Sequence, residues 1–294
     1  MMRSLLFVPA DSERKLAKAP DCGADVVVLD LEDAVAADRK AAARLGAADF
    51  LKSTSTSGPR IHVRVNGLDS GLIEADLDAI VPTRPDAIML PKAESGGDVE
   101  LLSAMIAARE AIAGLDDGAV SIVAIATETP GALFNFATYK GASARLTGLA
   151  WSSEDIAAAV GAGTCYDEDG ALTDPFRLAR SLCLYGAAHA GVAAVDRVFP
   201  NFRDAATLRG EAEAAARDGF TAKLAIHPGQ VAVINEVFTP SQEVIARAKA
   251  IVAAFAAAPG AGVIGFEGQM LDLPHLAKAK ALLKRAATTG LPVS

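Results

Sequence analysis

The stretch Val26-Val27-Val28-Leu29 is followed at once by Asp30-Leu31-Glu32-Asp33. A short apolar run rich in β-branched residues is typical of a strand buried on both faces, as in parallel sheets. Runs of this kind recur along the chain and alternate with Ala-rich amphipathic stretches. The expected strands cover residues 4–9, 26–32, 60–66, 87–92, 121–128, 146–152, 195–201 and 223–228. The expected helices cover residues 12–19, 38–52, 74–81, 99–113, 132–140, 176–190, 208–218, 241–256 and 275–285.

Regular alternation of strands and helices predicts a parallel sheet. Eight such units favour a closed (β/α)8 TIM barrel, and the open doubly wound sheet is the alternative. The chain has 294 residues, which exceeds a typical barrel of about 250 residues. Because the eighth unit precedes the surplus, we expect a catalytic barrel over residues 1–259 and a separate C-terminal segment over residues 260–294, with a helix at its end.

The composition of the chain excludes several classes of protein. With 51% apolar and 22% charged residues the chain is globular rather than disordered. A net charge of −8 argues against nucleic acid as a partner. The three cysteines lack C-x-x-C spacing, which argues against a disulfide framework or a zinc knuckle. Neither a signal peptide nor a run of about 18 apolar residues stands out. We therefore expect a cytoplasmic protein with no membrane partner.

Charged residues stand where the predicted strands end. Asp30, Glu32 and Asp33 end the second strand, Arg64 the third and Lys92 the fourth. Glu128 ends the fifth strand, and Asp155 follows the sixth. In a TIM barrel the carboxyl ends of the strands carry the active site. The sequence therefore predicts a site of mixed charge at one rim of the barrel.

Two pairs of interpretations stay open for the central residues of this rim. Glu128 and Asp155 lie on adjacent units and could share Mg²⁺, which takes one or two carboxylates together with water and substrate oxygens. They could instead cap the helices that follow them. Arg64 could bind a carboxylate or enolate oxygen of a substrate, or it could simply neutralise the acidic rim.

Nine motifs, taken together in order and spacing, resemble the citrate lyase beta subunit family, including its free-standing acyl-CoA lyase relatives. The motifs are Arg3-Ser4-Leu5-Leu6-Phe7-Val8-Pro9, Asp30-Leu31-Glu32-Asp33-Ala34-Val35, Val63-Arg64-Val65-Asn66, Leu90-Pro91-Lys92, Glu128-Thr129-Pro130-Gly131-Ala132, Glu154-Asp155-Ile156, Gly219-Phe220 with Lys223, Ala225-Ile226-His227-Pro228, and Met270-Leu271-Asp272-Leu273-Pro274.

The resemblance implies a TIM barrel that holds Mg²⁺ through Glu128 and Asp155, with Arg64 in contact with the substrate's oxygens. It also implies that residues 260–294 form a lid over the site of a neighbouring subunit, in a homotrimer or a hexamer. Asp272 on that lid would then act as catalytic acid or base. The sequence departs from the family at Ser152, where Gly is usual. Because Gly lets a backbone approach a ligand closely, the shape of the carboxylate pocket depends on this position.

The reaction implied by the resemblance is that of an Mg²⁺-dependent oxo-acid-lyase. A 3-hydroxyacyl thioester of the malyl, citramalyl or citryl type, carried on CoA or an acyl carrier protein, would be cleaved into a 2-oxo acid and an acyl thioester. One alternative is a metal-dependent aldolase that acts on free 2-oxo acids. Another is a non-catalytic lyase-like subunit.

Overall fold

A computed structural model describes residues 2–54 and 58–287 of the chain. The chain divides into two compact units, one from Met2 to Asn235 and one from Glu236 onward. Within the described residues, no helix is long and apolar enough to cross a membrane.

The first unit is built on eight parallel strands that close into a barrel, with β1 paired to both β2 and β8. The strands are β1 (Ser4–Pro9), β2 (Val26–Asp30), β3 (Arg60–Arg64), β4 (Ala87–Leu90), β5 (Ser121–Ile125), β6 (Leu146–Ala150), β7 (Ala193–Asp196) and β8 (Ala222–Ala225). This confirms the predicted TIM barrel and excludes the open sheet, because a closed barrel has no edge strand.

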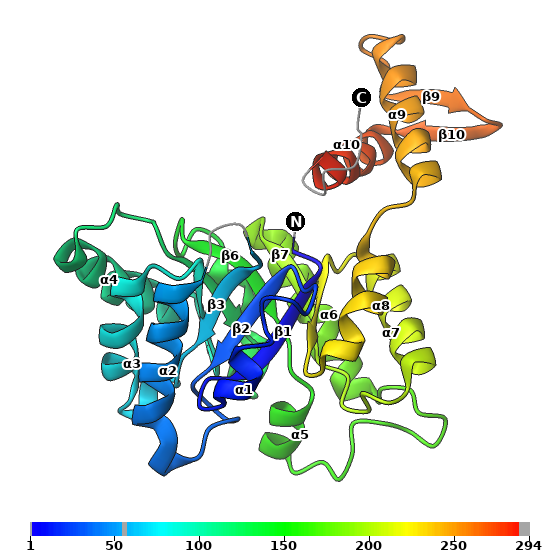
Figure 1. Ribbon diagram of the computed structural model, residues 1–294. Helices are drawn as coiled ribbons and strands as arrows, with labels where there is room; N and C mark the ends of the chain where they lie inside the picture. Colours follow the sequence, from blue (N-terminus) through cyan, green and yellow to red (C-terminus); the bar gives the residue numbers. More distant parts are fainter. Residues whose placement is uncertain (1, 55–57, 288–294) are drawn as a thin grey trace. The chain divides into compact units, whose positions relative to one another are not determined.

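Helices surround these strands (Figure 1). They are α1 (Glu13–Leu16), α2 (Lys40–Ser53), α3 (Ile73–Ile80), α4 (Gly96–Ala113), α5 (Glu154–Val160), α6 (Asp174–Ala190), α7 (Ala205–Asp218) and α8 (Pro228–Phe238). All five residues of β2 are buried. Alternate strand residues such as Val26 and Val28 fill the barrel interior together with Met89 and Leu224. Burial on both faces explains why the strands are near-continuous apolar runs.

The expected helix over residues 132–140 is wrong. The structure has two short 3-10 helices there, Gly131–Phe134 and Phe136–Tyr139. Asn135 lies between them, and its side-chain Nδ2 donates to the Gly131 carbonyl (3.3 Å). The Thr138 hydroxyl donates to the Asn135 carbonyl (2.7 Å). Side chains of this type compete for the backbone groups that an α-helix would use.

The C-terminal unit contains α9 (Gln242–Ala256), a hairpin of β9 (Val263–Phe266) and β10 (Gln269–Asp272), and α10 (Leu273–Ala287). The Ser241 hydroxyl caps α9 by accepting from the Val244 N–H (3.2 Å). The hairpin, which was not expected, turns at Glu267 and Gly268, whose φ angles are both positive (47° and 74°), as a two-residue type I′ turn requires. The unit begins before α9, because α9 packs against α10. The boundary expected from the sequence, after residue 259, instead follows α9.

Candidate active site

The candidate site is a pocket of about 410 Å³ in the barrel unit. Arg64 ends β3, and Asp30 ends β2. Glu128 follows β5, and Asp155 lies in the first turn of α5, directly after β6. All four line the pocket, so it opens at the carboxyl ends of the strands. The full lining consists of Phe7, Pro9, Lys15, Asp30, Asp33, Ala34, Arg64, Ile125, Glu128, Trp151, Ser152, Glu154, Asp155, Val198, Leu224 and Ile226.

Acidic partners fix the Arg64 guanidinium in place. Its Nε and Nη2 donate to the two carboxylate oxygens of Asp30 (2.8 and 2.7 Å), and its Nη1 lies 2.9 Å from Glu32 Oε2. The guanidinium also lies over the Phe7 ring, 4.7 Å from its centroid. Burial opposes the charge of Arg64, but the hydrogen-bonded Asp30 and the nearby carboxylates raise its pKa above the usual range. Arg64 therefore stays charged, and it does neutralise the acidic rim.

Lys92 links the β4 end of the rim to two acidic residues. Its Nζ pairs with Glu32, and its backbone N–H donates to Glu128 Oε2. The φ angle of Lys92 is +52°, which lies in the left-handed region that non-glycine residues rarely adopt. Sequence reasoning placed the Lys92 side chain at the rim but did not foresee the backbone contact, because a positive φ leaves no signal in a residue other than Gly.

Glu128 and Asp155 form a pair of like charges in the pocket. Glu128 is only 4% exposed. Its burial and the nearby Asp155 carboxylate raise its pKa well above the usual range, against the Lys92 N–H that favours the charged form. A cation between the two carboxylates would relieve this repulsion. Within the described residues no cluster of three or more His, Cys, Asp or Glu side chains could hold a metal. Two neighbouring carboxylates fit Mg²⁺, which takes one or two carboxylates and fills its remaining positions with water and substrate oxygens.

Buried polar residues anchor the segment between β6 and α5. The Trp151 Nε1 donates to Asp196 Oδ1 (2.7 Å), and the fully buried Lys223 Nζ donates to Asp196 Oδ2 (2.6 Å). Arg197 Nη1 donates to the Ser153 hydroxyl (2.9 Å). Burial opposes the charge of Asp196, yet Lys223 and Trp151 hold its pKa below the usual value. The sequence analysis does not predict this network. The signal that could have indicated it is the charged residue Asp196 at the end of β7.

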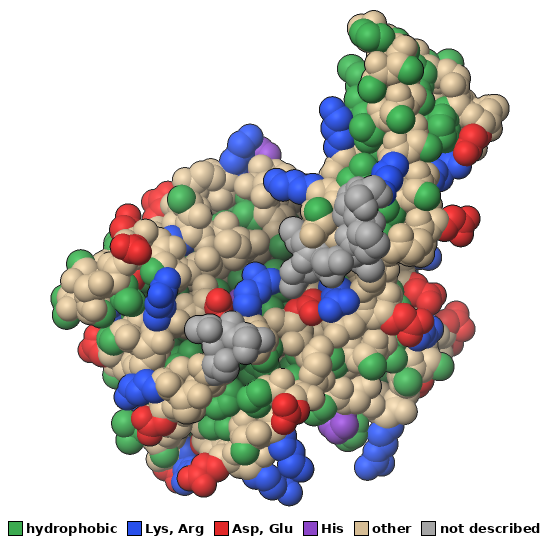
Figure 2. Space-filling model, turned by 45° about the horizontal axis from the view of Figure 1, so that its top comes forward, with side chains coloured by type: hydrophobic (Ala, Val, Ile, Leu, Met, Phe, Trp, Pro, Cys, Tyr) green, Lys and Arg blue, Asp and Glu red, His purple; other side chains and the backbone are tan. Residues whose placement is uncertain are grey.

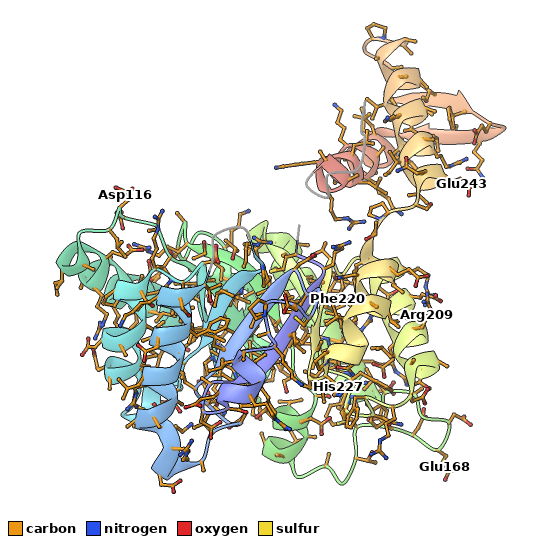
Figure 3. The ribbon with its side chains drawn as sticks, viewed as in Figure 1. Asp116, Glu168, Arg209, Phe220, His227 and Glu243 are labelled. Atoms are coloured by element: carbon orange, nitrogen blue, oxygen red, sulfur yellow. The ribbon has the colours of Figure 1, made fainter. Side chains whose placement is uncertain are left out.

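His227 follows β8 at the end of the barrel where α5 lies (Figure 3). Its Nδ1 accepts from the Gly229 N–H (3.0 Å), and its ring stacks on Phe202 with 4.6 Å between centroids. These contacts give His227 a packing role at the strand end.

On the face drawn in Figure 2, Lys and Arg side chains are interspersed with Asp and Glu side chains.

The structure brings Arg64, Glu128 and Asp155 together, whereas Asp272 belongs to the C-terminal unit. Asp272 ends β10, and its Oδ1 lies 2.6 Å from Nδ1 of His275. Both side chains are half exposed. The hydrogen bond from His275 lowers the pKa of Asp272, so this carboxyl group favours its charged form.

Comparisons with known proteins agree with this architecture. The family model "HpcH/HpaI aldolase/citrate lyase" matches residues 3–228. A second model, for a C-C bond lyase of the TIM-barrel fold, matches residues 176–291. The citrate lyase subunit beta-like protein of Mycobacterium tuberculosis is 37% identical over 96% of this chain and 94% of its own length. The mitochondrial citramalyl-CoA lyase of Rattus norvegicus is 33% identical over 97% of this chain and 86% of its own length.

A solved structure gives a similar result. The crystal structure of CitE from Mycobacterium tuberculosis, in complex with magnesium, acetoacetate and coenzyme A, superposes with a TM-score of 0.77. It is 35% identical and covers 97% of this chain and 98% of that chain. With a family model that spans most of the barrel and relatives matched over nearly the whole chain, this chain belongs to the HpcH/HpaI aldolase/citrate lyase family.

Proposed function

We propose that this protein is an Mg²⁺-dependent carbon–carbon lyase that cleaves a 3-hydroxyacyl thioester into a 2-oxo acid and an acyl thioester. The observation that carries the proposal is the buried pair Glu128 and Asp155 beside the fixed Arg64 guanidinium in one pocket. Relatives named as citrate lyase subunit beta-like and citramalyl-CoA lyase support the same class of reaction.

Glu128 and Asp155 would hold the metal ion. When bound, Mg²⁺ would polarise substrate oxygens and lower the pKa of the substrate hydroxyl. Glu128 is poorly solvated and repelled by Asp155 without a cation, so the pair is built to receive positive charge. Glu128 also contributes to substrate binding, because it lines the same pocket as Arg64.

Arg64 would stabilise the negative charge that develops on substrate oxygens as the carbon–carbon bond breaks. Asp30 accepts hydrogen bonds from Nε and Nη2 of Arg64, and Glu32 lies against Nη1. The guanidinium is therefore oriented before substrate arrives, and it does not have to reorganise during the reaction. Preorganised electrostatic stabilisation of this kind is usually the largest single contribution to catalysis.

Asp272 would transfer the proton to or from the reacting carbon of the acyl thioester. In the cleavage direction it would protonate the enolate carbon of the acyl thioester, and in the synthetic direction it would remove that proton. His275 favours the Asp272 carboxylate, which is the form that a base requires. We propose that Asp272 reaches the site of a neighbouring copy, with residues 260–294 as the lid in a homotrimer or hexamer.

We further propose a thioester of CoA or an acyl carrier protein as the substrate and the cytoplasm as the location. Coenzyme A is bound in the related CitE structure. Cys22, Cys165 and Cys183 are free thiols, which suits a reducing compartment.

The first test is a turnover assay with purified protein, Mg²⁺ and malyl-, citramalyl- and citryl-CoA, with release of the 2-oxo acid as the signal. We expect at least one thioester to be cleaved and the matching free acid to be inert. Equal cleavage of the free acid would favour the aldolase instead. Absence of turnover together with absence of Mg²⁺ binding by calorimetry would favour a non-catalytic subunit.

The second test addresses the assigned residues. Glu128→Gln should weaken Mg²⁺ binding by at least about 10-fold, because it removes a charged ligand, and loss of a group that only orients a ligand already costs that much. Asp272→Asn should retain Mg²⁺ binding but lose turnover by roughly 100-fold or more, the scale of general acid–base catalysis. Asp116→Asn, on the exposed loop after α4 (Figure 3), is the matched control and should change neither quantity. Unchanged turnover in Asp272→Asn would eliminate its acid/base role.

A further inference from the structure

Ser152 occupies an unusual position beside Asp155. It lies two residues after β6 ends and lines the pocket together with Asp155. Its hydroxyl donates to Asp155 Oδ2 at 2.7 Å. A serine just before a helix commonly caps it through its side chain. Here the N-cap residue is Ser153, and neither hydroxyl makes a capping bond to a backbone N–H of α5.

The backbone of Ser152 is held rigidly, so its hydroxyl has a defined direction. The Ser152 N–H donates to the Thr127 hydroxyl (2.9 Å), and the Thr127 hydroxyl donates to the Ser152 carbonyl (3.1 Å). Thr127 is fully buried next to Glu128. The next residue along the chain is also held, because the Ser153 hydroxyl accepts from the buried Arg197. Ser152 is therefore fixed on both sides while its side chain faces the pocket.

The two carboxylates of the pair are held by separate donors. Glu128 Oε2 accepts from the Lys92 backbone N–H. Asp155 Oδ2 accepts from the Ser152 hydroxyl. In the described part of the chain, no other side chain donates a hydrogen bond to the Asp155 carboxylate. A carboxylate without this donor could rotate freely about its terminal torsion, which has a broad energy profile.

We propose that Ser152 is a positioning residue that fixes the Asp155 carboxylate for cation binding. The inference rests on the proposed function, in which Asp155 and Glu128 hold Mg²⁺. Hydrogen-bond partners of metal-ligating carboxylates are known to set ligand orientation, and their removal costs 10–100-fold in metal affinity or activity. A residue without a side-chain hydroxyl at position 152 would leave the Asp155 carboxylate without this donor.

The experiment is calorimetric titration of the full-length protein with MgCl₂ alone, which does not depend on turnover. Ser152→Ala removes the hydroxyl and keeps Cβ, whereas Ser152→Thr keeps the hydroxyl. We expect Ser152→Ala to weaken Mg²⁺ binding about 10-fold and Ser152→Thr to stay within about threefold of wild type. Ser181→Ala is the matched control on α6, where the hydroxyl donates to the Arg177 carbonyl of its own helix, and it should bind like wild type. Thermal unfolding of each variant tests whether the fold is intact.

The outcomes separate the positioning role from the metal site itself. If wild type binds Mg²⁺ and Ser152→Ala binds it equally well, Ser152 has no positioning role and the proposed function stands. An equal loss of Mg²⁺ affinity in Ser152→Ala and Ser152→Thr would also overturn the role of the hydroxyl. If wild type binds no Mg²⁺, the proposed metal site and the role of Ser152 are both overturned. A loss in Ser152→Ala at an unchanged unfolding midpoint, restored in Ser152→Thr, supports the proposal.

Discussion

Asp30→Asn should destabilise the barrel unit, because Asp30 is the main partner of Arg64. Asp30 is 1% exposed and the Arg64 side chain 12% exposed. The two oxygens of Asp30 accept from Arg64 at 2.8 and 2.7 Å and also from the backbone N–H groups of Glu32 and Ala34. An asparagine amide would place a donor against donors at one of these positions and would remove the charge.

The magnitude follows from the burial of the pair. Removing one partner of a buried ion pair costs about 3–5 kcal/mol. Glu32, 2.9 Å from Arg64 Nη1, still compensates part of the guanidinium charge. We therefore expect the lower end, about 3 kcal/mol. At about 2–4 °C per kcal/mol for a domain of this size, the thermal unfolding midpoint should fall by about 6–12 °C.

The assay is thermal and urea unfolding of Asp30→Asn beside Asp33→Asn. Asp33 belongs to the same segment and lies 3.9 Å from Arg64, but its side chain is 58% exposed. Exposed pairs contribute little, so Asp33→Asn should change stability by less than about 0.5 kcal/mol. Equal stability of the two variants would refute the conclusion that burial of the Asp30–Arg64 pair decides its contribution.

Two further predictions concern buried or strained residues. Burial, aided by nearby Arg60, lowers the pKa of His62 to about 3, so the unfolded chain takes up the proton first, near its ordinary value of about 6.5. The stability linked to neutral His62 is complete above about pH 6.5 and declines toward pH 3, by about 2 kcal/mol at pH 5. Urea unfolding of His62→Phe should show a correspondingly smaller loss between pH 7 and pH 5, and an equal loss would contradict the shift. Lys92 has a φ of +52°, which glycine adopts without strain, so Lys92→Gly should be more stable than Lys92→Ala by about 1 kcal/mol. Both variants lose the ion pair with Glu32, so the comparison isolates the backbone. The reverse order of stability in urea unfolding would rule out backbone strain at this position.

The strand pattern of the barrel could be predicted because parallel strands buried on both faces need continuous apolar residues. The starts of β1 to β6 match the expected runs, whereas β7 starts two residues earlier than expected and β8 one residue earlier. Every strand except β1 ends before the expected carboxyl end. Residues after Asp30 were expected to continue β2, yet the strand stops there. The charged residues that follow the last hydrogen-bonded pair of the sheet belong to the rim. The pattern of apolar residues does not mark the residue at which strand pairing ends.

The C-terminal segment was harder to predict from its own residues. Its exposed hairpin strands have few buried residues, so they lack the continuous apolar run that marked the barrel strands. The boundary before α9 depends on packing of α9 against α10. Such long-range contacts leave no local signal at the boundary itself.

For the site, the residue types and their order along the chain already determined that acids and bases meet at one rim, because parallel strands all end on the same side of a barrel. Only the tertiary structure decided how these groups are paired. It sets Asp30 and Glu32 on Arg64, the Lys92 N–H on Glu128 and the Ser152 hydroxyl on Asp155. The contacts to Arg64 and Glu128 depend on distances of a few ångströms between different βα units, the Lys92 contact also depends on one left-handed backbone angle, and the contact between Ser152 and Asp155 depends on the conformation of the loop after β6. Side-chain type and spacing in sequence carry none of these quantities, since they arise from closure of the barrel and from the conformations of its loops.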